Sequence, residues 1–106
     1  SELVGAFYDK QTPACQFLTA HEKELGGTEA VVNVVFHCAL VAEAFRRAGG
    51  RVRSLTYEDL DFASNDSLPR LEQAQLAVHE FIMANVEHPE AQKLVGMIAL
   101  AIDGVA

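Results

Sequence analysis

The hydrophobic pattern of this chain centres on one apolar run at residues 30–42, interrupted only by Asn33 and His37. The apolar positions of the run do not follow a single helical stripe. A segment of this kind must be covered on most of its circumference, either by the rest of the core or by a partner. The run therefore supports predictions about the fold and about self-association, and it does not indicate a reaction or a ligand.

The residues on either side of the run predict that it is helical. Gly26 and Gly49 are typical helix stops, and Thr28 is a suitable N-cap. We expect one continuous, central helix over 29–48, because a strand of that length is improbable and the second half of the run has strong helix propensity. The β-branched valines leave one alternative open, an α+β fold with a short strand at 30–36.

Apolar spacing and capping residues predict further helices on both sides of this one. Proline at a first helical position begins two of them, at Pro13 and Pro89, and Thr56 opens a capping box. A further turn of helix fits residues 3–8. We predict an all-α fold, a compact bundle of four principal helices with a short helix near 56–63; the principal helices are expected at about 13–25, 29–48, 68–86 and 89–103.

The core-facing positions of the last two long helices follow from helical spacing. In the first of them they are Leu71, Ala74, Val78, Phe81, Ile82 and Asn85, and in the second Ala91, Leu94, Val95, Ile98, Ala99 and Ile102. Gly96 lies in the middle of the last helix, where glycine is about 1 kcal/mol less favourable than alanine unless a neighbouring backbone needs the room.

Composition indicates one domain over 1–106 with more apolar surface than a small monomer needs. The chain has 106 residues, of which 50% are hydrophobic. Small domains have the most surface to cover for their volume, so some of this apolar surface is expected to be shared. A homodimer is the simplest way to share it.

The charge balance excludes several classes of partner. Eight basic and fifteen acidic residues give a formal net charge of −7, which argues against nucleic acid, including a helix-turn-helix reader, and against anionic membranes. A basic protein partner would suit this surface. Arg47, Arg51 and Arg53 are candidates for a local anion site, although helix-end placement and pairing with the acidic residues between 58 and 66 account for them more simply.

No membrane span or secretory leader is expected. The apolar run has about sixteen residues before Arg46 and is interrupted by polar ones, which is too short and too polar to cross a bilayer. The apolar patch near the first residue is far shorter than a signal core. We expect a cytoplasmic protein.

The residues that most often carry chemistry are not arranged for it. The four histidines show no metal-ligand spacing, so no metal or cofactor is predicted. His37 and Cys38 are adjacent on a helix and cannot face each other as base and nucleophile, and a buried thiol is usually inert. No phosphate loop or nucleophile elbow occurs. The sequence therefore favours a binding protein over an enzyme.

Candidate ligand or interface residues remain on the apolar helix and opposite it. Asn33 and His37 are four positions apart and share a face, where one buried polar residue can select a partner geometry. The full candidate set is Asn33, His37, Cys38, Val41 and His79. We predict a small acidic helical protein that acts by protein–protein interaction in a regulatory or adaptor role, as a homodimer. The alternative is a small-molecule-binding or catalytic bundle with a pocket near Asn33, His37 and His79.

Overall fold

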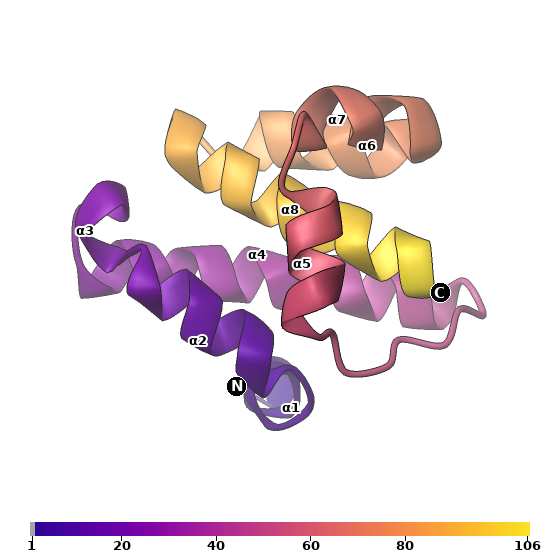
Figure 1. The fold of residues 1–106 in the computed structure, drawn as a ribbon, viewed down its shortest axis with the longest axis horizontal. Helices are drawn as coiled ribbons and strands as arrows, with labels where there is room; N and C mark the ends of the chain where they lie inside the picture. Colours follow the sequence, from indigo (N-terminus) through magenta and orange to yellow (C-terminus); the bar gives the residue numbers. More distant parts are fainter. Residues whose placement is uncertain (1) are drawn as a thin grey trace.

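The fold is all-α, as the sequence predicts. The computed structural model describes residues 2–106, which form eight helices and no strand (Figure 1). In chain order the helices are α1 (Glu2–Lys10), α2 (Thr12–Ala20), α3 (Glu22–Leu25), α4 (Thr28–Arg47), α5 (Tyr57–Ala63), α6 (Ser67–Ala74), α7 (Leu76–Asn85) and α8 (Pro89–Val105). They pack into a globule of 33 × 28 × 25 Å.

Helix α8 is the centre of the molecule. Every residue from Leu94 to Ile102 is buried, because α4, α5, α6 and α7 all pack against it (Figure 1). The six core positions predicted for this helix are all buried. The helix predicted to be central at 29–48 is central only in part: α4 packs against α1, α2, α3 and α8, but a smaller share of its residues is buried than in α8. Hydrophobic spacing shows which face of a helix is apolar, but not how much of the helix its neighbours cover.

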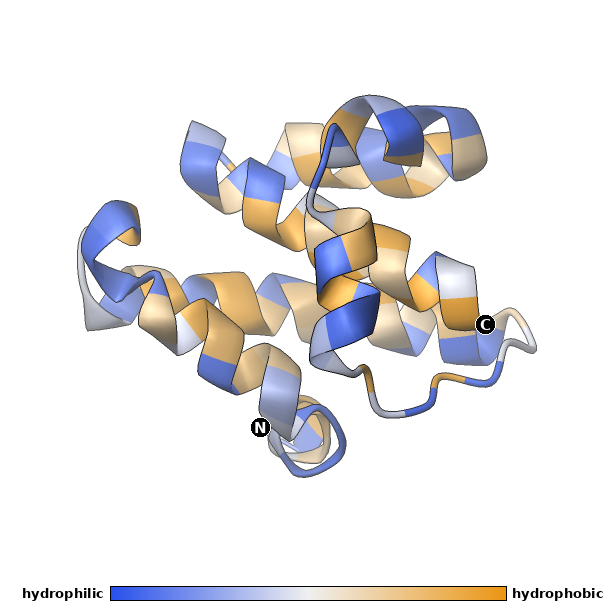
Figure 2. Cartoon of the chain, in the orientation of Figure 1, coloured by the Kyte–Doolittle hydropathy of each residue, from blue (hydrophilic) through white to orange (hydrophobic). Residues whose placement is uncertain are grey.

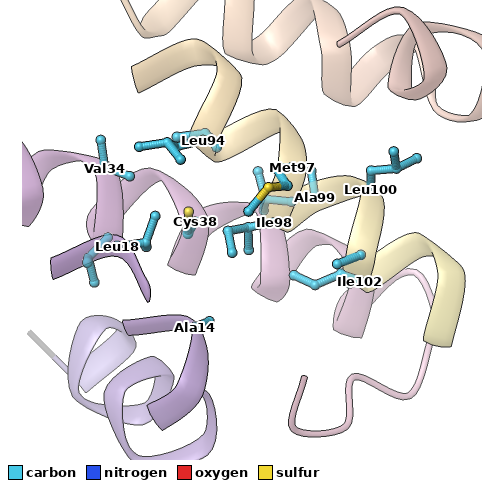
Figure 3. Close-up of a cluster of buried hydrophobic side chains, with 14 of the residues drawn as sticks. Ala14, Leu18, Val34, Cys38, Leu94, Met97, Ile98, Ala99, Leu100 and Ile102 are labelled. Atoms are coloured by element: carbon cyan, nitrogen blue, oxygen red, sulfur yellow. The ribbon is translucent and has the colours of Figure 1, made fainter. Parts of the chain in front are cut away.

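Helix α4 is continuous, so the strand alternative at 30–36 is wrong. Its predicted bounds are correct to one residue at each end. One side of α4 lies in the core, and Figure 3 shows Cys38 between Leu18 of α2 and Ile98 of α8. Hydrophobic residues follow the middle of α4 and α8 along this contact (Figure 2).

The predicted helix 13–25 is two helices, α2 and α3, which separate at His21. The backbone of His21 has φ −97° and ψ 13°, outside the α region. Its ring Nδ1 lies 2.9 Å from the carbonyl oxygen of Phe17. The predicted stop at Gly26 is confirmed, because Gly26 adopts the left-handed conformation with φ 103°.

The predicted helix 68–86 is also two helices, α6 and α7, which separate at Gln75. The backbone there is not helical, with φ −146° and ψ 77°. Gln75 Nε2 donates a hydrogen bond of 2.8 Å to Asp103 Oδ1 of α8, which holds the junction. Ala74 and Asn85, predicted to face the core, are exposed, because each is the last residue of its shortened helix.

Side-chain caps are present at the N-termini of α5 and α8. Thr56 and Asp59 form the predicted capping box of α5. His88 caps α8 by accepting a hydrogen bond from the backbone N–H of Glu90 at 3.2 Å. Thr28 is not the N-cap of α4 as predicted: Gly27 takes that place, and the Thr28 hydroxyl donates to Glu22 Oε1 at 3.0 Å. The side chain is drawn away because α3 ends immediately beside it.

Candidate functional site

The polar candidates on α4 and α7 do not form one site. Asn33 is exposed, whereas His37 is 8% exposed and points toward α7, where its ring lies 6.3 Å from that of Phe81. His37 Nδ1 lies 2.8 Å from the carbonyl oxygen of Asn33 and must carry the proton, since a carbonyl only accepts. His79 is partly exposed on α7. Four surface clefts are formed by other residues, and none of these three side chains lines any of them.

The two other candidates on α4 are core residues. Val41 and Cys38 are both buried. Burial raises the pKa of the Cys38 thiol far above its usual range, and burial also raises the pKa of Cys15 to about 11. Both cysteines are free thiols held in the unreactive form. Within residues 2–106, no group of three or more His, Cys, Asp or Glu side chains is arranged to hold a metal ion.

The arginine candidates have two kinds of environment: some form ion pairs with carboxylates, and some line a cleft. Arg47 Nε donates to Glu43 at 3.1 Å, and Arg46 donates to both oxygens of the same carboxylate at 2.7 and 2.8 Å. These hydrogen bonds from Arg46 and Arg47 lower the pKa of Glu43 to about 2. Arg53 is bidentate to Asp59, at 2.9 and 3.1 Å.

Arg51 and Arg53 line a cleft of about 510 Å³ between α1, α4 and the segment that follows α4. Its floor is apolar and is formed by Leu3, Ala6, Phe7, Ala39, Ala42 and Val52. Its rim is cationic and contains Lys10, Arg46, Arg51 and Arg53. We call this the cationic cleft. Sequence reasoning missed Lys10, because it is far from the arginine cluster in the chain and only the packing of α1 on α4 brings it there.

The side of α4 that faces away from α8 is exposed and partly apolar. Val32 is 51% and Phe36 40% exposed, and Leu40 continues the same line one turn further on. The other residues of this side are Glu29, Asn33, Ala44 and Arg47, all exposed. We call these seven residues the outer face of α4.

Helix α4 is long and apolar enough, by length and composition alone, to cross a membrane, which differs from the sequence expectation. The core helix of a globular protein passes the same criterion. Only 33% of its most apolar 18 residues are buried, so the rest of the chain leaves much of its apolar surface uncovered. That uncovered surface is the outer face of α4.

A groove adjoins the C-terminal half of the outer face of α4. It has a volume of about 800 Å³ and lies between α1 and α4. Its apolar lining is formed by Leu3, Ala6, Leu40 and Ala44, with Glu2, Glu43 and Arg47 at its edges. We call this the α1–α4 groove.

The other large exposed apolar side chains are scattered over the surface. Tyr57 and Phe62 of α5 already have partners: the Tyr57 hydroxyl donates to Gln16 at 2.8 Å, and the guanidinium of Arg70 lies over the Phe62 ring. Isolated exposed apolar residues of this kind are ordinary. The outer face of α4 differs because its three large apolar residues recur at every fourth position along one helix.

No family model, curated protein or solved structure matches the chain. The function is therefore argued from the outer face of α4 and from the clefts beside it.

Proposed function

We propose that the protein acts by protein–protein interaction and forms a homodimer through the outer face of α4. The observation that carries the proposal is the line of exposed Val32 and Phe36 and partly buried Leu40 on a helix whose opposite side lies in the core. A contiguous apolar patch on a small protein typically marks an interaction site. Helix α4 has 20 residues and is about 30 Å long, so a partner along it would contact nearly the whole 33 Å length of the molecule.

The outer face of α4 is complementary to itself when two copies pack antiparallel. A two-fold axis near position 38 places Phe36 of one copy opposite Leu40 of the other, and Val32 opposite Ala44. The same register places Glu29 of each copy opposite Arg47 of the other. Such a contact is isologous, so each pair occurs twice in the dimer.

Charge favours this antiparallel register over the registers that are shifted by one helical turn. A shift by one helical turn in one direction would put Glu29 opposite Glu43, a like-charge contact that is unfavourable. A shift in the other direction would leave Glu29 with no partner on α4. Only the register about position 38 pairs the apolar residues with one another and also pairs Glu29 with Arg47 at both ends of the outer face of α4.

The α1–α4 groove supplies room for the aromatic side chain. In this register, Phe36 of the second copy lies over Leu40, which lines the groove with Leu3 and Ala6. Aromatic side chains inserted into apolar pockets are typical anchors of protein interfaces. Asn33 of the second copy then approaches Glu43, whose carboxylate accepts hydrogen bonds from an amide. This contact gives the polar candidate Asn33 a place in the interface.

The experiment is a comparison of two phenylalanine variants by light scattering. Phe36→Glu buries a carboxylate in the proposed interface and is expected to give a monomer, whereas the unaltered chain gives a dimer. Phe62→Glu is the matched control, since Phe62 is 76% exposed on α5 and away from this face; it should remain dimeric. Circular dichroism should show equal helix content in all three proteins, because neither side chain is in the core.

Two results would contradict the dimer. One is a Phe36→Glu variant that keeps the mass of the unaltered protein. The other is an unaltered protein that is monomeric and floats with phosphatidylcholine vesicles, in which case a lipid surface covers the outer face of α4.

A regulatory or adaptor role, a cytoplasmic location and a basic protein as second partner belong to the same proposal. The basic partner rests on the net charge of −7, and the role and the location stay predictions from the sequence. The small-molecule alternative near Asn33, His37 and His79 stays a prediction, and none of these side chains lines any of the four clefts described above.

A further inference from the structure

We infer that the cationic cleft binds a small amphipathic anion, an aliphatic carboxylate whose chain lies on the apolar floor and whose headgroup lies between Lys10 and Arg51. Lys10 and Arg51 lie off the outer face of α4, so variants of these two residues leave the proposed dimer face unaltered, although Leu3 and Ala6 line both this cleft and the α1–α4 groove.

The floor of the cleft provides a surface for an alkyl chain. Phe7 and Ala39 are buried in the core below it, and Leu3 and Val52 are partly buried at its sides. A volume of about 510 Å³ is within the usual range of small-molecule sites. Such sites combine a mostly apolar lining with a few placed polar groups, and this cleft has both.

The rim concentrates positive charge on an acidic protein. The chain has eight Lys and Arg residues, and four of them line this one cleft. The only carboxylate in the lining is Glu43, and Arg46 and Arg47 already hold it. The cleft is therefore a positive site on a molecule whose net charge is −7.

Two of the rim cations have no acidic partner of their own. Arg46 and Arg53 are paired with Glu43 and Asp59, but within residues 2–106 no salt bridge involves Lys10 or Arg51. Both side chains are exposed at the rim, so neither has to give up an ion pair before it makes a charge-assisted hydrogen bond to an anion. These two residues are thus the expected headgroup ligands.

The segment that contains Arg51 and Arg53 is held in place by a buried glutamine. Gln11 is 1% exposed and makes two hydrogen bonds of 2.8 Å, donating to the carbonyl of Arg53 and accepting from the backbone N–H of Leu55. These bonds join the loop after α4 to the α1–α2 junction. Gln11 is a positioning residue, and the cleft is formed before any ligand arrives.

The test is calorimetric titration of the unaltered protein with acetate, octanoate and decanoate, kept below their micelle concentrations. Each added methylene should tighten binding about two- to fourfold, because it buries more apolar surface on the floor. Decyltrimethylammonium, which has the same chain and the opposite charge, should not bind. Acetate binding as tight as decanoate, or no saturable binding of decanoate, would overturn the inference.

Three glutamine variants identify the headgroup site. Lys10→Gln and Arg51→Gln should each weaken decanoate binding about tenfold, since each removes one charge-assisted contact. Lys23→Gln removes the same charge from an exposed position on α3, outside the cleft lining, and should bind decanoate as the unaltered protein does. Equal weakening in all three variants would show a general charge effect and would contradict the assignment of the site.

Discussion

At the scale of single residues, Gly96 marks the closest approach between two helices. A Cβ at this position would lie 2.6 Å from Leu68 Cδ2 and 3.3 Å from Leu68 Cγ, both at the start of α6. Gly104, in the same helix, has no atom within 4 Å of its Cβ position. The sequence suggested that such a glycine makes room for a neighbouring backbone, but here the neighbour is the Leu68 side chain.

These two glycines give opposite predictions for stability. Gly96→Leu should destabilise the fold by about 2 kcal/mol, because α6 must move away from α8. Gly104→Ala should stabilise it by about 0.5 kcal/mol through helix propensity. Chemical denaturation followed by circular dichroism measures both. A Gly96→Leu variant as stable as the unaltered protein would show that α6 does not pack closely on α8.

Asp59 gives a prediction that depends on pH. Hydrogen bonds from Arg53 and then from the Thr56 backbone lower the pKa of its carboxyl group below the ordinary value near 3.9. The stabilisation from this carboxylate is therefore complete above about pH 4 and is lost as the pH falls through the lowered pKa.

Asp59→Ala should cost about 1 kcal/mol of unfolding free energy at neutral pH, because it removes half of the capping box and an ion pair. The difference from the unaltered protein should shrink steadily on acidification below about pH 4. Urea titrations across this range measure it. Asp61→Ala, at an exposed position of the same helix, is the control and should change little. A cost that does not vary with pH would contradict the role of the carboxylate.

The thiols give a chemical prediction. Because burial raises the pKa of Cys38 and Cys15, neither should react with iodoacetamide in the folded protein at neutral pH, and both should react in guanidinium. Mass spectrometry counts the adducts. An Asn33→Cys variant supplies an exposed thiol on the same helix as a positive control. Rapid native labelling of Cys38 would restore the nucleophile hypothesis that its burial argues against.

The spacing of Asn33 and His37 was visible in the sequence, but their environments were not. Helical periodicity places the two residues on neighbouring turns. Whether each side chain is covered depends on where α7 and α1 pack, and residues far along the chain determine that. For the same reason, the sequence did not show that Lys10 lies near the arginine cluster in the folded chain.

At the scale of helices, the ends that depend on local signals were predictable and the internal breaks were not. Glycine near 26 and 49, the Thr56 capping box and Pro89 act through neighbouring residues, so these boundaries can be read directly. The breaks at His21 and Gln75 contain neither glycine nor proline. Gln75 is held by Asp103, 28 positions away, so only the tertiary structure shows the break.

The pairing of α4 with its copy predicts a charge-reversal rescue. Glu29→Lys and Arg47→Glu should each weaken the dimer about tenfold, because each turns two symmetry-related attractions into repulsions. The double variant restores opposite charges and should return the dissociation constant to within about twofold of the original. Sedimentation equilibrium measures all three. Additive weakening in the double variant would rule out the register about position 38.

At the scale of the whole molecule, α4 and α8 are both strongly apolar helices, and α8 is the one at the centre. Both segments are rich in hydrophobic residues, and composition favoured the valine-rich run of α4. Helices α3 to α7 all pack against α8, whereas Val32 and Phe36 of α4 are exposed. The sequence predicted that the run must be covered on most of its circumference; the other helices cover one side of it, and cover of the outer face of α4 by a partner stays a prediction.

The distribution of charge adds a second property of the whole molecule. A net charge of −7 describes most of the surface, but four cations gather at the cationic cleft. Net charge alone argues against anionic partners in general, but it does not determine whether a small anion binds at one site. The outer face of α4 and the cationic cleft are thus separate candidates, and their tests use different variants.

The most direct test of the central claim is the mass of the unaltered protein in solution. Sedimentation equilibrium over about 1 to 200 µM should show a dimer of twice the 11.5 kDa chain mass, with a dissociation constant in the micromolar range or below. A single species at the chain mass across this range would contradict the dimer and leave the outer face of α4 without its proposed partner.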